Sequence, residues 1–437
     1  MSAGPGGAPR PGRRRWAAVL LLACLLQPLL PPAPVAARDP RLGLAALLRP
    51  EEPPPPVEAP GYVVMDEATG QVLAERQGDV PRPPASITKI LTALVVLERS
   101  RPDDRVTVSR QASEVQGSRV YLSEGSTFTV RQLLLALMLA SANDAAVALA
   151  EHVAGSEAAF ARLLDQRAAQ LGARTAHFVN ASGLPAPGHV ASPLDMAVIA
   201  RAALRNPAFR QLVSVKEADI PWNHGDGPRH LVNHNRLLFL HPDVVGVKNG
   251  YTVEAGQTLV LAVRRGTREI LVVTMGGGLG NWEESYALAD WAFRSFYPVR
   301  AVDAGQRFLL RLPGGRRVEA EALRPLQIDL PVGSPALQIR VQAGVRAPSP
   351  GRTVGWAGAY LDGRLLGRVP LRQPAPVAGQ EASAGAGPGR KGWEGWLLLL
   401  VLLAGGAWEW RLRRLRRRRL LERQRRRLST LPDPNGR

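Results

Sequence analysis

The chain has 437 residues, 45% of them hydrophobic, so it is long enough to bury two or three domain cores. Its single cysteine, Cys24, excludes an internal disulfide framework. The net charge of +19 does not indicate a nucleic-acid partner, because residues 411–427 alone hold eleven arginines and one glutamate. These arginines follow an apolar run, and attraction to anionic lipid at a membrane surface accounts for them.

The N-terminus is expected to be a secretory signal peptide, residues 1–37. Arginines precede the apolar run "WAAVLLLACLLQPLL", and "PPAPVAA" follows it. An alternative reads "LLAC" as a lipoprotein box with Cys24 as the acylated residue. Apolar residues continue past the cysteine, which favours cleavage after Ala37 instead.

Residues 38–60 are expected to form an extended spacer, because "RPEEPPPPVEAP" cannot form helix or sheet ladders. The first folded domain is then expected at residues 61–297. It opens with "YVVMDEATGQVLAERQ", whose alternation around "ATGQ" predicts a β-hairpin. From Ser86 the apolar period becomes helical.

The middle of this domain is predicted to be helical and its end to return to strands. Helices are expected over residues 130–153 and 156–170, and "SPLDMAVIARAAL" begins with Ser192 as N-cap. Strands are expected at "VVGVKNGYT", "TLVLAVRR" and "EILVVTMGG", before the closing helix "WEESYALADWAFRSF". Strands, then helices, then strands predict an α+β domain, in which a helical lobe is inserted into an antiparallel sheet.

The C-terminal part is predicted to be a small all-β domain followed by a membrane anchor. Short alternating stretches punctuated by Gly and Pro indicate strands over residues 298–372, and a Pro, Ala and Gly-rich linker follows at 373–392. Residues 393–410, "WEGWLLLLVLLAGGAWEW", predict a short transmembrane helix with tryptophans at both margins. An in-plane amphipathic helix is the alternative, but the run is apolar on every face.

The arginine-rich tail, residues 411–437, is expected to lie in the cytoplasm by the positive-inside rule. The expected location is therefore the cell membrane, as a single-pass protein whose folded domains lie outside the cytoplasmic membrane.

Lysine is rare in this chain: only four of the 56 basic residues are lysines. Arginine stays protonated in proteins, whereas a buried lysine can lose its proton and act as a base. Lys89 lies three residues after Ser86 on a predicted helix, so both side chains project from one face. A neutral Lys89 could take the proton from Ser86 as the hydroxyl attacks a carbonyl.

Two further motifs accompany this pair. "SAN" at 141–143 and "KNG" at 248–250 are the single S-x-N and K-x-G patterns of the chain, and "SITK" at 86–89 is its single S-x-x-K. All three lie in the predicted α+β domain. A serine and a lysine three apart are a weak signal alone, but the three motifs in this order form a specific set.

With these motifs, the chain resembles the penicillin-binding serine D-alanyl-D-alanine carboxypeptidases, which share their S-x-x-K, S-x-N and K-T-G signature with the serine β-lactamases. The resemblance covers roughly residues 55–372, and includes the phrases "PASITKILTAL", "LMLASANDAA", "NHNRLL" and "GVKNGYT". It implies a penicillin-binding protein/serine β-lactamase-like fold, peptidoglycan stem peptides as substrate and β-lactam antibiotics as inhibitors. It implies no cofactor.

The resemblance also implies residue roles. Ser86 would be the acyl-ester nucleophile, Lys89 its base, and Ser141 a proton relay towards the leaving D-alanine. Asn143 would hold Lys89 and the substrate amide, with Lys248 opposite as a positive charge. The backbone N–H groups of Ser86 and Tyr251 would form the oxyanion hole. The implied substrate-binding residues are Asn143, Lys248, Asn249, Gly250, Tyr251 and Thr252.

One position departs from the family pattern. Asn249 stands where threonine or serine is usual, and that hydroxyl contacts the terminal carboxylate of the peptide. An asparagine NH2 group can still donate to a carboxylate. Acylation is therefore expected to survive, while substrate preference or β-lactam affinity changes. His234 and Thr252 are further candidates for carboxylate binding.

No metal site is expected. His224, His230, His234 and His241 are close in sequence, but no H-E-x-x-H or comparable pairing with a carboxylate is present.

Three functions remain open at this point. The first is a D-alanyl-D-alanine carboxypeptidase that trims stem pentapeptides during cell-wall biogenesis. The second is a β-lactamase, which needs fast hydrolysis of the penicilloyl ester. The third is a non-catalytic cell-wall binding protein, in which Asn249 marks lost activity.

Overall fold

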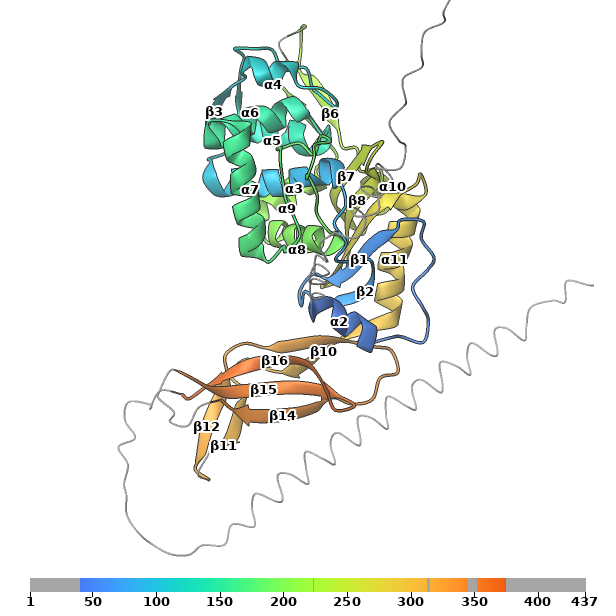
Figure 1. Cartoon of the computed structure of the whole chain (residues 1–437), viewed down its shortest axis with the longest axis vertical. Helices are drawn as coiled ribbons and strands as arrows, with labels where there is room; N and C mark the ends of the chain where they lie inside the picture. Colours follow the sequence, from blue (N-terminus) through green and yellow to red (C-terminus); the bar gives the residue numbers. More distant parts are fainter. Residues whose placement is uncertain (1–39, 223, 313–314, 345–351, 375–437) are drawn as a thin grey trace, which may run out of the picture. The chain divides into compact units, whose positions relative to one another are not determined.

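The computed structural model describes residues 40–222, 224–312, 315–344 and 352–374. Its central element is a five-stranded antiparallel sheet in the order β2-β1-β9-β8-β7 (Figure 1). The strands are β1 (Gly61–Asp66), β2 (Val72–Arg76), β7 (Val244–Thr252), β8 (Gly256–Arg265) and β9 (Arg268–Gly277). Strand β1 pairs with β9 along its whole length. The predicted hairpin and the pairing of sequence-distant ends are both confirmed.

Alternate residues of the sheet face two separate cores, as the period of two requires. On β1, Val63 and Met65 pack against the helical lobe, and Tyr62 and Val64 pack against the layer that contains α11. Helix α11 (Asn281–Ser295) covers that second face of the sheet (Figure 1).

The helical lobe is inserted between β2 and β7. Its helices are the 3₁₀ turn η1 (Ala85–Thr88), α3 (Lys89–Arg99), α4 (Arg110–Glu114), α5 (Val130–Leu139), α6 (Asn143–Ala154), α7 (Glu157–Leu171), α8 (Pro193–Leu204), α9 (Pro207–Ser214) and α10 (Leu237–Leu240). Two short antiparallel strand pairs accompany them: β3 (Arg105–Thr107) with β4 (Thr127–Thr129), and β5 (Glu217–Ile220) with β6 (Arg229–Val232). Ser192 caps α8 as predicted, in a capping box with Asp195.

The predicted single helix over 130–153 is wrong, because the chain breaks it after Leu139. Ala140 to Ala142 leave the helical conformation, and Ser141 adopts a left-handed backbone with φ of 57°. Helix α6 then restarts at Asn143. The apolar periodicity runs through "LMLASANDAA" without glycine or proline, so periodicity alone could not locate the break.

The expectation of a spacer over 38–60 is also wrong in part. Helix α2 (Pro40–Leu47) packs against β2, and Leu42 and Leu48 are buried in the two cores. Residues 49–60 form neither helix nor strand, as predicted, but Val57 and Ala59 are buried too. The folded domain therefore begins before residue 61.

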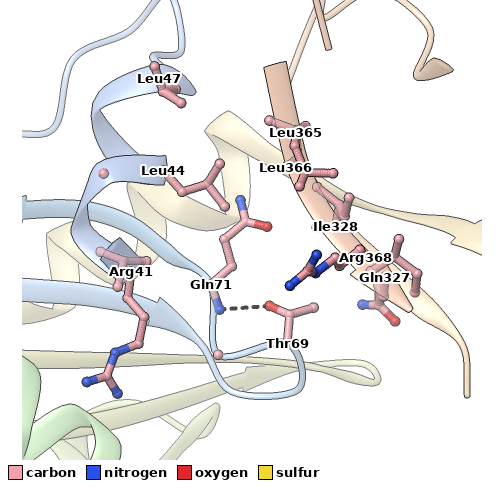
Figure 2. Close-up of a pocket in the computed structure, with 15 residues that line it drawn as sticks. Arg41, Leu44, Leu47, Thr69, Gln71, Gln327, Ile328, Leu365, Leu366 and Arg368 are labelled. Atoms are coloured by element: carbon pink, nitrogen blue, oxygen red, sulfur yellow. Dashed lines mark hydrogen bonds between the residues drawn. The ribbon is translucent and has the colours of Figure 1, made fainter. Parts of the chain in front are cut away.

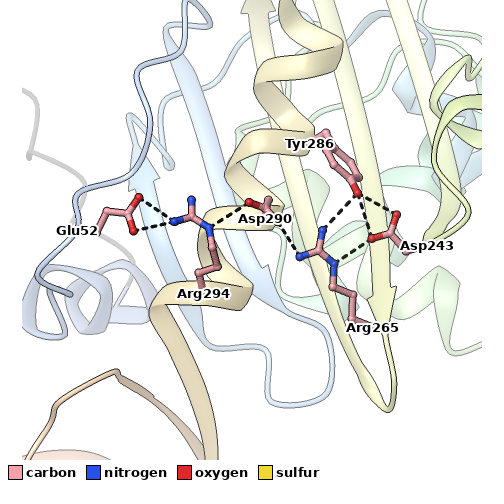
Figure 3. Close-up of polar contacts among 6 residues, drawn as sticks. All are labelled: Glu52, Asp243, Arg265, Tyr286, Asp290 and Arg294. Carbon is pink, nitrogen blue, oxygen red and sulfur yellow. Dashed lines mark hydrogen bonds and ion pairs between the residues drawn. The ribbon is translucent and has the colours of Figure 1, made fainter. Parts of the chain in front are cut away.

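Polar contacts hold this N-terminal segment against α11 (Figure 3). Arg294 on α11 pairs with both Glu52, at 2.9 Å, and Asp290. Asp290 also pairs with Arg265 on β8, which contacts Asp243. In addition, the Trp291 indole N–H donates to the Glu52 carbonyl at 2.9 Å. Both the side chain and the backbone carbonyl of Glu52 therefore bind to α11.

A second β region follows α11. Its strands are β10 (Phe296–Val302), β11 (Arg307–Arg311), β12 (Arg317–Ala322), β13 (Leu326–Pro331), β14 (Gln338–Ala343), β15 (Thr353–Leu361) and β16 (Arg364–Arg372). Strands β10 and β13 pair with each other, and the others form a sheet in the order β11-β12-β16-β15-β14. Residues 296–372 are called the β-domain below.

Buried polar contacts connect the β-domain to the sheet of the first domain. Arg268 on β9 lies between Asp66 at 3.2 Å and Asp329 on β13 at 2.8 Å. Burial, followed by the negative charge of Asp66, raises the pKa of Asp329 to about 6. The Gln71 side chain both donates to and accepts from the Asp329 backbone. Arg268 and Gln71 therefore both connect Asp329 of the β-domain to the first domain.

Beside these contacts lies a cavity of about 720 Å³ (Figure 2). Leu44 and Leu47 of α2 and the β1–β2 turn line one side, while Ile328, Leu365 and Arg368 of the β-domain line the other.

The predicted transmembrane helix at 393–410, the signal peptide and the arginine-rich tail lie outside the described residues. Among the helices that are described, none is both long and apolar enough to cross a bilayer.

Candidate active site

Ser86 and Lys89 come together at the start of α3. Ser86 lies on the 3₁₀ turn η1 and is half-buried, whereas Lys89 is the first residue of α3 and is fully buried. The Lys89 Nζ atom lies 3.0 Å from the Ser86 Oγ atom. The tighter 3₁₀ turn replaces the regular helix that was predicted from Ser86, and the two side chains still meet.

Lys89 is surrounded by acceptors and forms no ion pair with a carboxylate of the described residues, although the negative charge of Asp144 acts to raise its pKa. Its Nζ atom also lies 2.8 Å from Asn143 Oδ1 and 2.6 Å from the Ser182 carbonyl oxygen. Burial lowers the pKa of Lys89 well below its ordinary value, and the positive charge of Lys248 lowers it further. A neutral amine would keep two N–H bonds, to Asn143 and Ser182, and turn its lone pair to the Ser86 hydroxyl. This is the geometry of a general base.

The break between α5 and α6 positions the second motif. Asn143 starts α6, and its Nδ2 atom donates to the Gln116 carbonyl at 2.7 Å while its Oδ1 atom faces Lys89. Because the Gln116 carbonyl can only accept, it must face the NH2 group of Asn143, and this fixes the orientation of the carboxamide. Ser141 is buried beside it, and its hydroxyl makes no hydrogen bond to another described residue. A hydroxyl held without a partner can turn to a ligand.

Lys248 lies on β7 and is also buried. Its Nζ atom donates to the Asn249 carbonyl at 2.9 Å and has Asn249 Oδ1 at 3.5 Å. Burial lowers the pKa of Lys248 to about 7. Lys89 and Lys248 are both buried, and their charges influence each other. Lys89 can therefore accept a proton, while Lys248 can attract a carboxylate.

Strand β7 passes directly beside the serine turn. A Cβ atom added at Gly250 would lie 2.6 Å from the Ser86 backbone nitrogen, so only glycine allows this approach. Tyr251 follows and is 60% exposed. The Thr252 hydroxyl accepts from the Ala255 N–H at 3.0 Å, which gives it a role in the β7–β8 turn. His234 lies near Lys248, and desolvation together with that charge lowers the His234 pKa.

Sequence reasoning missed the loop that holds Lys89 from behind, residues 178–184. The Ala181 carbonyl accepts from the Thr92 hydroxyl at 2.7 Å, next to the Ser182 carbonyl that accepts from Lys89. Gly183 fits against Ala85, because an added Cβ atom would lie 1.9 Å from the Ala85 carbonyl oxygen. The run "NASGLPAPG" indicates turns. No local sequence pattern predicts that this loop lies beside Lys89.

His189 was also missed, and it connects this loop to the serine turn. The Val179 N–H donates to His189 Nδ1 at 3.1 Å, so the proton is on Nε2, which lies 2.9 Å from Thr88 Oγ1. Thr88 is the residue between Ile87 and Lys89. Burial, then the charges of His177 and Lys89, lowers the pKa of His189 to about 4. A protonated ring would direct an N–H at the Val179 N–H, so this contact requires neutral histidine.

The neutral state of His189 predicts a stability loss in acid. His189 has a pKa of 6.5 in the unfolded chain and of about 4 in the folded chain. Between these two pH values the unfolded chain binds the proton and the folded chain does not, so the free energy of unfolding decreases as the pH falls below 6.5. This group should contribute a loss of about 2 kcal/mol from pH 7 to pH 5. Urea unfolding at both pH values should show that His189→Gln loses this part of the pH dependence. The exposed His152→Gln is the matched control, and an unchanged slope in His189→Gln would contradict the assignment.

Within the described ranges, no group of three or more His, Cys, Asp or Glu side chains could hold a metal ion. Three of the four histidines that are close in sequence have other contacts: His224 with Ser123, His230 with Asp219, and His241 stacked on Tyr286.

Comparison with known proteins finds similar sequences and structures in one family. Residues 49–278 match the family model described as D-alanyl-D-alanine carboxypeptidase. The chain is 29% identical to D-alanyl-D-alanine carboxypeptidase DacF of Bacillus subtilis over 329 residues, which cover 72% of this chain and 84% of the relative. It is 36% identical to DacB2 of Mycobacterium tuberculosis over 242 residues, covering 54% and 82%.

Solved structures extend the similarity into the β-domain. Penicillin binding protein 5 of Haemophilus influenzae aligns with a TM-score of 0.66 and 27% identity, covering 74% of this chain and 98% of that one. The D-alanyl-D-alanine carboxypeptidase DacD of Francisella tularensis aligns with a TM-score of 0.63 and 25% identity, covering 75% and 95%.

Proposed function

Because this chain belongs to the D-alanyl-D-alanine carboxypeptidase family, it is a serine-type hydrolase of cell-wall metabolism, and we propose that it acts through an acyl-enzyme on Ser86. The substrate would be the peptidoglycan stem pentapeptide, which ends in D-alanyl-D-alanine. One observation carries the proposed mechanism: the buried Lys89 amine lies 3.0 Å from the Ser86 hydroxyl and has no carboxylate partner among the residues that the structure describes.

In acylation, the Lys89 lone pair would take the Ser86 proton as Oγ attacks the carbonyl carbon of the penultimate D-alanine. The backbone N–H groups of Ser86 and Tyr251 would stabilise the oxyanion, which is supported by the close approach of Gly250 to the Ser86 nitrogen. The peptide C–N bond then breaks, and a proton relayed through Ser141 leaves on the amine of the terminal D-alanine. Water would hydrolyse the Ser86 ester, with its proton returned through Lys89.

Lys248 and Asn249 are proposed to bind the terminal carboxylate. Lys248 supplies positive charge from β7. The Asn249 Oδ1 atom lies on the Lys248 side, at 3.5 Å from Nζ, so the Nδ2 group is left to donate to the substrate.

Mass spectrometry of the reaction with diacetyl-Lys-D-Ala-D-Ala tests the function. We expect loss of one D-alanine from the substrate, and a transient adduct on the Ser86 peptide. The Ser86→Ala variant should show neither. Turnover that persists in Ser86→Ala would rule out this nucleophile.

Asn249 should set the affinity for the substrate carboxylate. We expect Asn249→Thr to change KM for diacetyl-Lys-D-Ala-D-Ala by about two- to tenfold, because one charge-assisted donor replaces another of different reach, with kcat within about twofold. Steady-state D-alanine release measures both constants. If KM and fluorescent-penicillin affinity both stay constant, Asn249 does not contact the carboxylate.

The β-lactamase alternative is not favoured, because the relatives reported above are carboxypeptidases or penicillin-binding proteins. We propose that β-lactams acylate Ser86 and remain bound. A penicillin-hydrolysis assay separates the two: rapid turnover would favour the lactamase, and a long-lived adduct the carboxypeptidase.

We also propose that the enzyme is anchored in the cell membrane with its folded domains outside. The supporting features are the apolar run at 393–410 and the arginine-rich residues 411–427. Protease protection in spheroplasts tests this: external protease should remove the folded domains and spare the C-terminal tail.

A further inference from the structure

The outer face of the β-domain sheet carries two aromatic residues on one strand. Residues Trp356, Gly358 and Tyr360 of β15 share this face, since side chains alternate along a strand and Ala357 and Ala359 are buried on the other side. Neighbouring strands place arginines in the row between the two rings: Arg340 of β14 and Arg368 of β16 both pair with Gly358.

Each aromatic ring is stacked by one of these arginines. The Arg368 guanidinium lies 4.5 Å from the Trp356 ring centroid, and that of Arg340 lies 4.8 Å from the Tyr360 ring. Both arginines are exposed and both rings are half-buried. Neither guanidinium has a carboxylate partner in the described part of the chain, although Arg340 donates to a glutamine at 2.8 Å. We call this set the arginine-aromatic face: Gln338, Arg340, Gln342, Trp356, Tyr360 and Arg368.

The β-domain as a whole is basic. Residues 296–372 contain twelve arginines, no lysine and five acidic residues. Four of its five acidic groups are engaged elsewhere: Glu319 and Glu321 pair with Arg307 and Arg372, Asp303 pairs with Arg300, and Asp329 is buried with Arg268. The fifth, Asp362, lies in the turn between β15 and β16. The arginine-aromatic face therefore complements an anionic partner.

The face continues into the cavity of Figure 2. Arg368 and Leu365 line that cavity, and Leu365 also pairs with Tyr360 in the sheet register. A partner that lies across β14, β15 and β16, which are consecutive in the sheet, can thus extend beside Leu44 and Leu47 of α2. Such a path suits an extended polymer better than a small ligand.

We propose that the arginine-aromatic face binds an anionic glycan polymer, namely the peptidoglycan that the active site trims. Aromatic rings present flat apolar surfaces to the C–H faces of sugar rings, and guanidinium groups pair bidentately with carboxylates of the attached peptides. The identity of the polymer rests on the proposed function. The face itself contains no residue of the Ser86 site, so it is a separate binding surface.

Co-sedimentation with purified insoluble peptidoglycan tests the proposal, with the full-length chain in non-ionic detergent. Arg340→Glu/Arg368→Glu should lower the bound fraction about fivefold or more at ~0.1 M salt. The matched control is Arg311→Glu/Arg317→Glu, which changes net charge equally at an exposed cross-strand pair of β11 and β12. It should lower binding much less. Trp356→Ala, with its melting temperature recorded, tests the aromatic contribution through a separate side chain.

Activity measurements distinguish the two proposals. Release of D-alanine from soluble diacetyl-Lys-D-Ala-D-Ala should be unchanged in Arg340→Glu/Arg368→Glu, while release from insoluble peptidoglycan falls. If the wild type released no D-alanine, the proposed function would fail, yet the sedimentation result would still stand. Equal losses in both double variants would overturn the face as a specific surface. Binding to beads coated with phosphatidylglycerol is measured in parallel. If Arg340→Glu/Arg368→Glu lowers binding to these beads but not to peptidoglycan, the face binds lipid and the proposal is overturned.

Discussion

Lys89→Arg should abolish acylation of Ser86 although it preserves the positive charge. Arginine stays protonated in proteins, so it has no lone pair for the serine proton. Loss of a general base costs about 10²–10⁴-fold in rate, and we expect at least the upper end because no other neutral base touches Ser86 Oγ in the described structure. Labelling kinetics with fluorescent penicillin measure the acylation rate directly.

The control for Lys89→Arg is Lys216→Arg, the same change at an exposed lysine on the loop before β5. It should leave labelling and thermal stability unchanged. Because Lys89 is fully buried, the larger guanidinium could also disturb packing, so a melting temperature accompanies each variant. Lys89→Met removes the base without adding volume and should be equally inactive. A folded Lys89→Arg protein that labels within tenfold of the wild type would refute the proposed base.

Gly183→Ala should destabilise the protein and disturb the active site together. Gly183 has φ of 85°, and the new methyl group would lie 1.9 Å from the Ala85 carbonyl oxygen, which is backbone and cannot rotate away. The left-handed conformation and the clash together should cost about 2–4 kcal/mol. The clash pushes Ala85 and the Ser182 carbonyl apart, so acylation should slow even at temperatures where the variant is folded.

Gly188→Ala separates the cost of the left-handed backbone conformation from the cost of the steric clash. Gly188 also has a positive φ, of 81°, but its added methyl group would meet nothing closer than 3.5 Å, at His177. It should cost about 1–2 kcal/mol from the backbone alone and leave acylation unchanged. Urea unfolding and penicillin labelling of both variants give the comparison. Equal stability and equal labelling of Gly183→Ala and Gly188→Ala would contradict the role of the 178–184 loop.

The sequence predicted the groups at the site better than the framework that holds them. Ser86, Lys89 and Asn143 were found by short motifs, because a reaction requires particular functional groups at fixed local spacing. Ser182 acts through its backbone carbonyl, which any residue possesses, so its identity carried no signal. His189 is one of seven histidines, and only the fold shows that it contacts Thr88.

The errors in the fold have a related origin. The break at Ser141 interrupts a continuous apolar pattern, and what stabilises it is distant in sequence: the contacts of Asn143 with Lys89 and Gln116. Helix α2 is eight residues long and too short to be stable alone. Its burial against β2 through Leu42 decides its structure, and that tertiary contact is invisible to local propensity.

The pairing of β1 with β9 has a consequence for the order of folding. Val64 of β1 pairs with Val272 of β9, so the centre of the sheet joins segments separated by roughly 200 residues. As the chain is synthesised from its N-terminus, the edge of β1 that pairs with β9 stays unpaired until the whole helical lobe has been made. Sheet closure should therefore be a late and slow step. Until then, the edge of β1 is the segment most exposed to wrong pairing, and folding factors would protect this protein most at that stage.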